Sequence, residues 1–120
     1  MNEKKNIVVD KSKAFAIRII RLYQYLKTEK QEHVLSKQLL RSGTSIGANI
    51  KEAIRGQSKA DFYAKLNISL KEASETEYWL ELLQETDYLD KKQFDSLYND
   101  IQELIKLLVS ITKTQKENKQ

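Results

Sequence analysis

The sequence contains no cysteine and no proline, and among its 120 residues it has only three glycines and one histidine. The absence of cysteine excludes disulfides, thiol chemistry and Cys-based zinc sites, and the single His33 leaves too few imidazoles for most metal sites. So few turn-forming residues argue against the many tight turns of a small β-sandwich or barrel. The sequence therefore predicts neither a metal nor another cofactor.

Long apolar runs are also missing. No stretch has the roughly 20 apolar residues that a membrane-spanning helix needs, and residues 1–10 lack the apolar core of a signal peptide. We expect one domain over residues 1–120 with flexible tails, in a protein that is cytoplasmic and makes no contact with a membrane.

Charge is abundant and unevenly placed along the chain. The formal net charge is +4, but residues 1–30 carry +5, residues 31–60 carry +3, residues 61–90 carry −6 and residues 91–120 carry +2. Within one domain, such asymmetry predicts either helices of opposite charge lying side by side or a basic surface for a polyanion.

Apolar residues recur every three or four positions in four segments, which is the spacing of one face of an α-helix. Polar capping residues mark the four starts: Asp10 before a helix over 11–27, Thr28 with Gln31 before 29–55, Ser58 with Asp61 before 59–86, and Asp90 with Gln93 before 91–113. Such helices cannot each bury an apolar seam alone. The sequence predicts an all-α, antiparallel, up-down-up-down four-helix bundle with left-handed packing.

Small residues crowd the middle of the second predicted helix. Gly43 and Gly47 each lower helix propensity by about 1 kcal/mol relative to alanine, so tertiary contacts must compensate. Being four residues apart, they lie on one face, and we predict that a neighbouring backbone approaches there. The alternative is a backbone that lines a ligand site, although no Gly-rich phosphate loop is present.

The same helix carries a row of cations, which we call the basic stripe: Lys37, Arg41, Lys51 and Arg55. Their spacing places them on one helical face. Lys59 extends the stripe, and cations of the first helix, among them Lys11, widen it if the two helices pack side by side. The predicted nucleic-acid site comprises Arg18, Arg21, Lys37, Arg41, Lys51, Arg55 and Lys59. The alternatives are a solvated face or pairing with acids of the third helix.

The sequence shows no spacing of residues that is typical of a catalytic site. The third predicted helix is rich in glutamate, but a di-metal site in a bundle needs Glu-x-x-His on two helices, and His33 directly follows Glu32. No spacing joins a nucleophile, a base and a residue that orients it. We predict no catalytic residue and expect the protein not to be an enzyme.

An apolar ridge of Ile68, Trp79 and Leu82 lies outside the seam that the third helix needs for a core. A wide apolar stripe is compatible with a thick core, but in so small a bundle it favours self-association. The sequence predicts that these three residues belong to an oligomer interface.

Residues 37–54, Phe62 and residues 68–82 closely resemble the small bacterial four-helix-bundle proteins encoded within intervening sequences of 23S ribosomal RNA genes. The R-S-x-x-S-I-x-x-N-I-x-E pattern of residues 41–52 is the most specific part of the resemblance. The resemblance implies a homopentamer. It also implies kinship to the accessory protein of diversity-generating retroelements, a basic pentameric barrel that binds nucleic acid and a reverse transcriptase. By the same resemblance, Arg41, Ser45, Asn49 and Glu52 form a shared polar set with a structural role.

Charge, periodicity and resemblance lead to one functional hypothesis. We expect a non-enzymatic, oligomeric helical bundle that binds RNA or DNA through phosphate contacts of its first two helices. The alternative is a protein–protein interaction scaffold without nucleic-acid binding.

Overall fold

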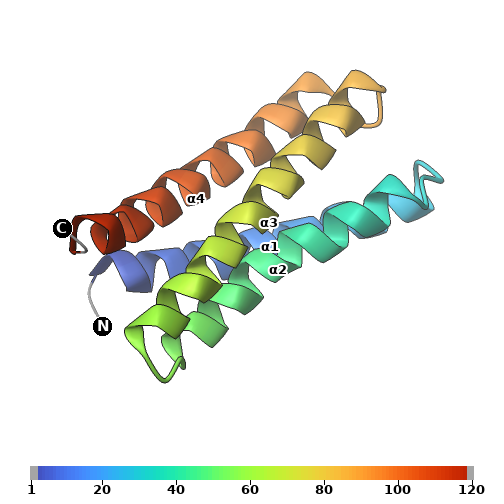
Figure 1. Cartoon of the computed structure of the whole chain (residues 1–120). Helices are drawn as coiled ribbons and strands as arrows, with labels where there is room; N and C mark the ends of the chain where they lie inside the picture. Colours follow the sequence, from blue (N-terminus) through green and yellow to red (C-terminus); the bar gives the residue numbers. More distant parts are fainter. Residues whose placement is uncertain (1–2, 119–120) are drawn as a thin grey trace.

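The computed structural model describes residues 3–118, and within them the side chains of residues 3–114. It contains α1 (Glu3–Thr28), α2 (Leu35–Ile54), α3 (Lys59–Glu85) and α4 (Lys91–Asn118). Each helix packs against the next, and α4 returns to α1 (Figure 1). The predicted all-α up-down bundle is confirmed. No helix within residues 3–118 is long and apolar enough to cross a membrane.

One core runs along the axis of the bundle, which measures 48 × 22 × 21 Å. Every helix contributes a completely buried aliphatic side chain, as Ile19, Ile46, Leu80 and Ile101 illustrate. Burying such a side chain stabilises the fold by about 1.5–3 kcal/mol, so the apolar seams supply most of the packing energy. Buried hydroxyl groups join the seams of α2 and α3, where Thr76 Oγ1 donates to Ser42 Oγ over 2.9 Å.

The seam between α1 and α4 is less extensive than the other three. Figure 1 shows the α1–α2 pair diverging from the α3–α4 pair toward the end of the bundle that holds the two loops 29–34 and 86–90. Two ion pairs also cross this seam, from Arg18 to Asp100 and from Lys11 to Glu103.

The starts of α3 and α4 follow the capping residues found in the sequence. The Ser58 side chain accepts a hydrogen bond from the Asp61 backbone N–H over 3.1 Å. Asp90 Oδ1 accepts from the Gln93 N–H over 2.7 Å, and Gln93 Oε1 accepts from the Asp90 N–H over 3.0 Å. Both caps satisfy N–H groups that have no partner within the helix, and both predictions are confirmed.

The predicted starts of the first two helices are wrong. Helix α1 begins at Glu3 rather than at residue 11, because Val8 continues the buried seam and is 1% exposed, whereas Asp10 is exposed within the helix. Helix α4 likewise runs past residue 113, to Asn118.

Helix α2 begins at Leu35 rather than at residue 29. Thr28 ends α1 and its hydroxyl donates back to the Gln24 carbonyl, while Gln31 adopts a φ of 53° in the turn. The N–H groups at the start of α2 are instead satisfied by the buried Glu32 carboxylate, which accepts from Val34, Leu35 and Ser36. A carboxylate at this position also interacts favourably with the helix dipole.

The glycines of α2 lie against α1, which confirms the predicted close packing; a neighbouring backbone lies near Gly47, whereas the neighbour of Gly43 is the Ile19 side chain. A Cβ on Gly43 would come within 2.8 Å of Ile19 Cγ2, and one on Gly47 would lie 3.3 Å from Ser12 Oγ. Close packing at Gly43 therefore depends on the missing side chain, whereas the space at Gly47 is larger.

Candidate nucleic-acid interface

The basic stripe lies on the outer face of α2. Lys37, Arg41, Lys51 and Arg55 are all exposed, and so is Lys59 at the start of α3. None of these five side chains makes a hydrogen bond or ion pair with another side chain among the residues that the structure describes, although the charge of Arg41 acts on Glu72. Four of the five predicted cations are therefore available to an anion.

Arg41 differs from the rest of the stripe because it lies near α3. Burial and the neighbouring Glu75 raise the pKa of Glu72 above its ordinary value, and the Arg41 charge partly offsets this effect. Arg41 therefore balances an acid of α3 as well as facing solvent.

A groove of about 570 Å³ runs between α1 and α2 beside the basic stripe. Lys13, Lys51 and Arg55 line it, with Asp10 as the acidic residue among its lining groups. Small residues form much of the remaining wall: Ser12, Ala16, Thr44, Gly47 and Ala48. The groove thus combines a net positive charge with close access to the helix backbones.

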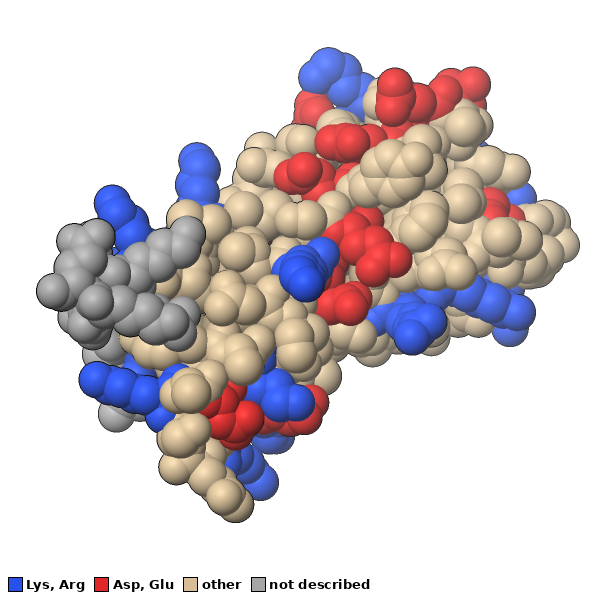
Figure 2. All heavy atoms as spheres, viewed as in Figure 1, with Lys and Arg blue, Asp and Glu red and all other residues tan. Residues whose placement is uncertain are grey.

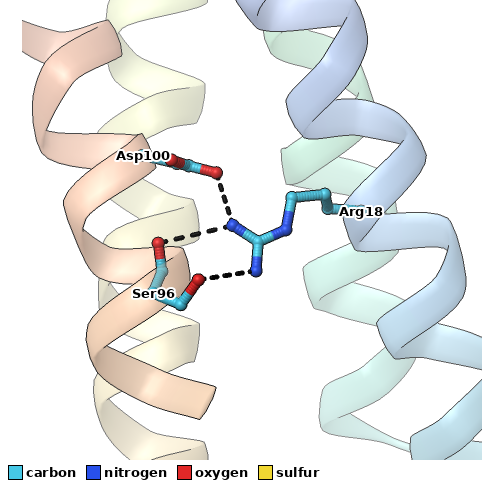
Figure 3. A network of polar contacts seen from close by, with 3 residues as sticks. All are labelled: Arg18, Ser96 and Asp100. Carbon is cyan, nitrogen blue, oxygen red and sulfur yellow. Dashed lines mark hydrogen bonds and ion pairs between the residues drawn. The ribbon is translucent and has the colours of Figure 1, made fainter. Parts of the chain in front are cut away.

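The structure does not bring all the predicted cations of α1 to this groove. Arg18 lies on the opposite flank of α1, where its Nη1 donates to Asp100 Oδ2 over 2.5 Å and its Nη2 to Ser96 Oγ over 2.9 Å (Figure 3). Lys11 pairs with Glu103 over 2.6 Å, a contact that raises the pKa of Lys11. Both cations tie α1 to α4 and do not widen the basic stripe.

Arg21 is exposed beside Arg18 and lines a second, smaller pocket between α1 and α4. The cation that α1 does contribute to the α1/α2 groove is Lys13, which the sequence reasoning missed. Lys13 lies two positions beyond Lys11, and about 200° of helical rotation separates them. Because Lys11 faces α4, this rotation places Lys13 on the flank of α1 that faces α2.

Acidic side chains lie mainly on the other helix pair. Figure 2 shows them gathered over α3 and the adjoining part of α4, while Lys and Arg side chains lie along the edge formed by α2. Tyr98 donates to Glu81 over 3.1 Å, and Gln102 donates to Glu77. Burial, followed by the bond to Glu81, raises the pKa of Tyr98. These two glutamates are therefore engaged by α4 rather than by the basic stripe.

The shared polar set of α2 forms contacts within and beside the helix. Ser45 Oγ donates to the Arg41 carbonyl over 2.6 Å, and Asn49 Nδ2 donates to the Ser45 carbonyl over 2.8 Å. Glu52 pairs with Lys65 of α3 over 3.3 Å. These contacts link α2 to its own turns and to α3, which fits a structural role.

The apolar ridge of α3 is only partly covered by its own chain. Ile68 is 41% exposed, while Trp79 and Leu82 are half-buried. Trp79 Nε1 donates to Glu75 Oε1 over 3.2 Å. The ridge therefore retains apolar surface for a further contact.

No three His, Cys, Asp or Glu side chains of the described residues form a group that could hold a metal ion. The surface offers instead exposed cations beside a groove.

Comparison with known proteins places this arrangement in a family. Residues 4–110 match the family model described as 23S rRNA-intervening sequence protein. A crystal structure from Bacteroides thetaiotaomicron, of a protein with unknown function from the S23 ribosomal protein family, is 61% identical in sequence. The match covers 92% of this chain and 98% of that chain, with a TM-score of 0.91. No curated protein matches the chain. Because the family model spans nearly all of the four helices, the chain belongs to the 23S rRNA-intervening sequence protein family.

Proposed function

We propose that the protein binds the phosphate backbone of RNA or DNA, without catalysing a reaction, along the basic stripe and the α1/α2 groove. The observation that carries this proposal is the meeting of Lys13, Lys51 and Arg55 at one groove whose lining holds a single carboxylate, that of Asp10. Unpaired cations at a surface attract polyanions, since each phosphate contact releases condensed counterions.

The length of the basic stripe suits a polymer rather than a single small anion. Lys37 and Arg55 are separated by 18 positions of one continuous helical path, about 27 Å at the rise of an α-helix. One strand of B-DNA carries about eight phosphates over that distance. Contacts of this kind position a backbone but read no bases, so we expect little sequence preference.

Assembly is the second part of the proposal. The ridge of Ile68, Trp79 and Leu82 belongs to α3, whereas the groove lies between α1 and α2. Copies joined through the ridge would therefore keep their grooves accessible, and several grooves would strengthen weak phosphate binding through avidity. A homopentamer, kinship to the retroelement accessory protein and a reverse transcriptase as partner are further parts of this proposal, and they rest on family resemblance.

The test measures binding of fluorescently labelled random-sequence RNA and DNA at several salt concentrations. Lys51→Glu with Arg55→Glu should weaken binding to every sequence equally and flatten the dependence of log K on log salt, by about one unit of slope per lost contact. Lys92→Glu with Lys106→Glu is the matched control, because these two lysines are exposed on α4 and the double change alters the net charge equally.

Equal binding by the two double variants would contradict the groove assignment. If the parent binds no nucleic acid even at low salt, the interaction-scaffold alternative, which the exposed ridge favours, is the better account. Light scattering tests assembly separately, and a monodisperse species of 14.0 kDa would contradict it.

A further inference from the structure

The pocket between α1 and α4 has no part in the function proposed above. It measures about 290 Å³ and lies toward the end where the two helix pairs diverge in Figure 1. Its lining is Arg18, Arg21, Leu22, Tyr25, Gln93 and Leu97. Pockets for small molecules measure about 300–1,000 Å³, so this one has room for a single small group and not for a helix or a duplex.

The apolar part of the pocket lining comes from two leucines and one tyrosine. Leu22 is 8% exposed and Leu97 is 5% exposed, so both present their small accessible area to this space. Tyr25 adds a half-buried aromatic ring. Aromatic rings beside a cationic surface are the usual stacking platform for the bases of a single strand.

The charge of the pocket amounts to one available cation. Arg18 is held by Asp100 and Ser96, as Figure 3 shows, so its charge is already matched by a carboxylate. Arg21 is exposed and pairs with no side chain among the described residues. A single guanidinium matches the single negative charge of a phosphodiester.

The remaining polar groups of the lining can meet a base edge. Gln93 uses Oε1 to accept from the Asp90 N–H, which leaves the two hydrogens of its amide nitrogen as donors. The Tyr25 hydroxyl makes no hydrogen bond with another described residue. Donors that are free at the rim of an apolar pocket favour a ligand with both a planar face and acceptor atoms.

We infer that this pocket receives one unstacked base of a single-stranded nucleic acid, with the adjoining phosphodiester on Arg21. The inference rests on the proposed nucleic-acid binding and adds that single strands are preferred over duplexes. Helix α1 forms a wall of both sites, since it contributes Lys13 to the groove and Arg21 to the pocket. A strand that follows the groove therefore reaches the pocket by crossing one helix.

The parent protein provides the first experiment, which needs no variant. Fluorescence anisotropy compares a labelled oligouridylate with a strand of equal length and charge in which abasic residues replace the bases, and with a duplex. We expect the strand with bases to bind about fivefold or more tightly than the abasic strand, the lower end of what one stacked base contributes.

Variants then assign that preference to the pocket. Tyr25→Leu should remove the difference between the two strands, whereas Tyr25→Phe should keep it because the ring remains. Tyr23→Leu is the matched control: Tyr23 is half-buried on the same helix, lies near Lys27 and does not line the pocket. Gln93→Glu retains the acceptor that caps α4 and places a negative charge at the rim, so it should weaken binding of both strands.

Three outcomes would overturn the inference in distinguishable ways. Equal binding of the base-bearing and abasic strands refutes the pocket but leaves the proposed function intact. A preference that survives in Tyr25→Leu places the base elsewhere. If no nucleic acid binds the parent, the proposed function fails and this inference fails with it.

Discussion

Replacing Gly43 with alanine tests how closely α1 approaches α2. The new Cβ would lie 2.8 Å from Ile19 Cγ2 and 2.9 Å from Ile19 Cγ1, and Ile19 is 0% exposed, so its side chain has no open space to enter. Overpacking of a core costs about 1–3 kcal/mol, while alanine improves helix propensity by about 1 kcal/mol. Two contacts below 3.0 Å against a buried side chain place the cost in the upper part of that range, at about 2–3 kcal/mol, so we expect Gly43→Ala to lower the free energy of unfolding by about 1–2 kcal/mol.

Urea unfolding followed by circular dichroism measures this loss, and Gly47→Ala is its matched control. A Cβ on Gly47 meets Ser12 Oγ at 3.3 Å, so a shift of a few tenths of an ångström accommodates it. Gly47→Ala should then fall between no change and a gain of about 1 kcal/mol.

A double-mutant cycle with Ile19→Ala identifies the contact responsible. With both Cγ atoms removed, the remaining contact of the alanine methyl at position 43 is with the Cβ of residue 19 at 3.2 Å, which a shift of a few tenths of an ångström relieves, and Gly43→Ala should no longer destabilise the protein. The reasoning is refuted if Gly43→Ala is as stable as the parent, or if its cost is unchanged in the Ile19→Ala background.

Two further predictions concern carboxylates. Glu32→Ala should lower the free energy of unfolding by about 1–2 kcal/mol, because it removes the buried acceptor for the N–H groups of Leu35 and Ser36. Urea unfolding measures this loss. Glu29→Ala is the control, and it should change the free energy of unfolding little because Glu29 is exposed. Glu72→Gln should raise the melting temperature at pH 7, because burial and Glu75 raise the pKa of Glu72 and so disfavour its charged form in the folded state. That gain should disappear as the pH falls below the ordinary value of 4.5, where Glu72 is protonated in both states; a gain independent of pH would contradict the assignment.

The apolar seams of the helices were predictable because the spacing of apolar residues along the sequence is enough to identify them. The caps at Ser58 and Asp90 were predictable for a similar reason, since a side chain and an N–H three residues away form a local unit. The start of α2 was not predictable from a local pattern, because it depends on how the chain reverses direction between α1 and α2. A one-residue connection after residue 27 is too short for antiparallel helices, which need about 2–8 residues, and the structure uses residues 29–34 instead.

The placement of the α1 cations was not predictable for a different reason. Periodicity fixes the angle between Lys11, Lys13 and Arg18 around the helix, but it does not say which flank faces α2 and which faces α4. That choice depends on the direction in which successive helices are arranged around the core. In this bundle, it places Arg18 against Asp100 and Lys13 beside the α1/α2 groove.

The two interpretations of the small residues in α2 turn out to be compatible. Gly43 lies against the side chain of the buried Ile19, while Gly47 and Ala48 line the groove. Both follow from one cause: small side chains let α1 come near and, farther along the same helix, leave the surface between the two helices unfilled. Lys51 and Arg55 lie at the edge of that space, where Ile50 and Ile54 of α2 complete the lining. A larger residue at Ala48 would therefore be tolerated by the core and would obstruct the groove, since Ala48 is exposed.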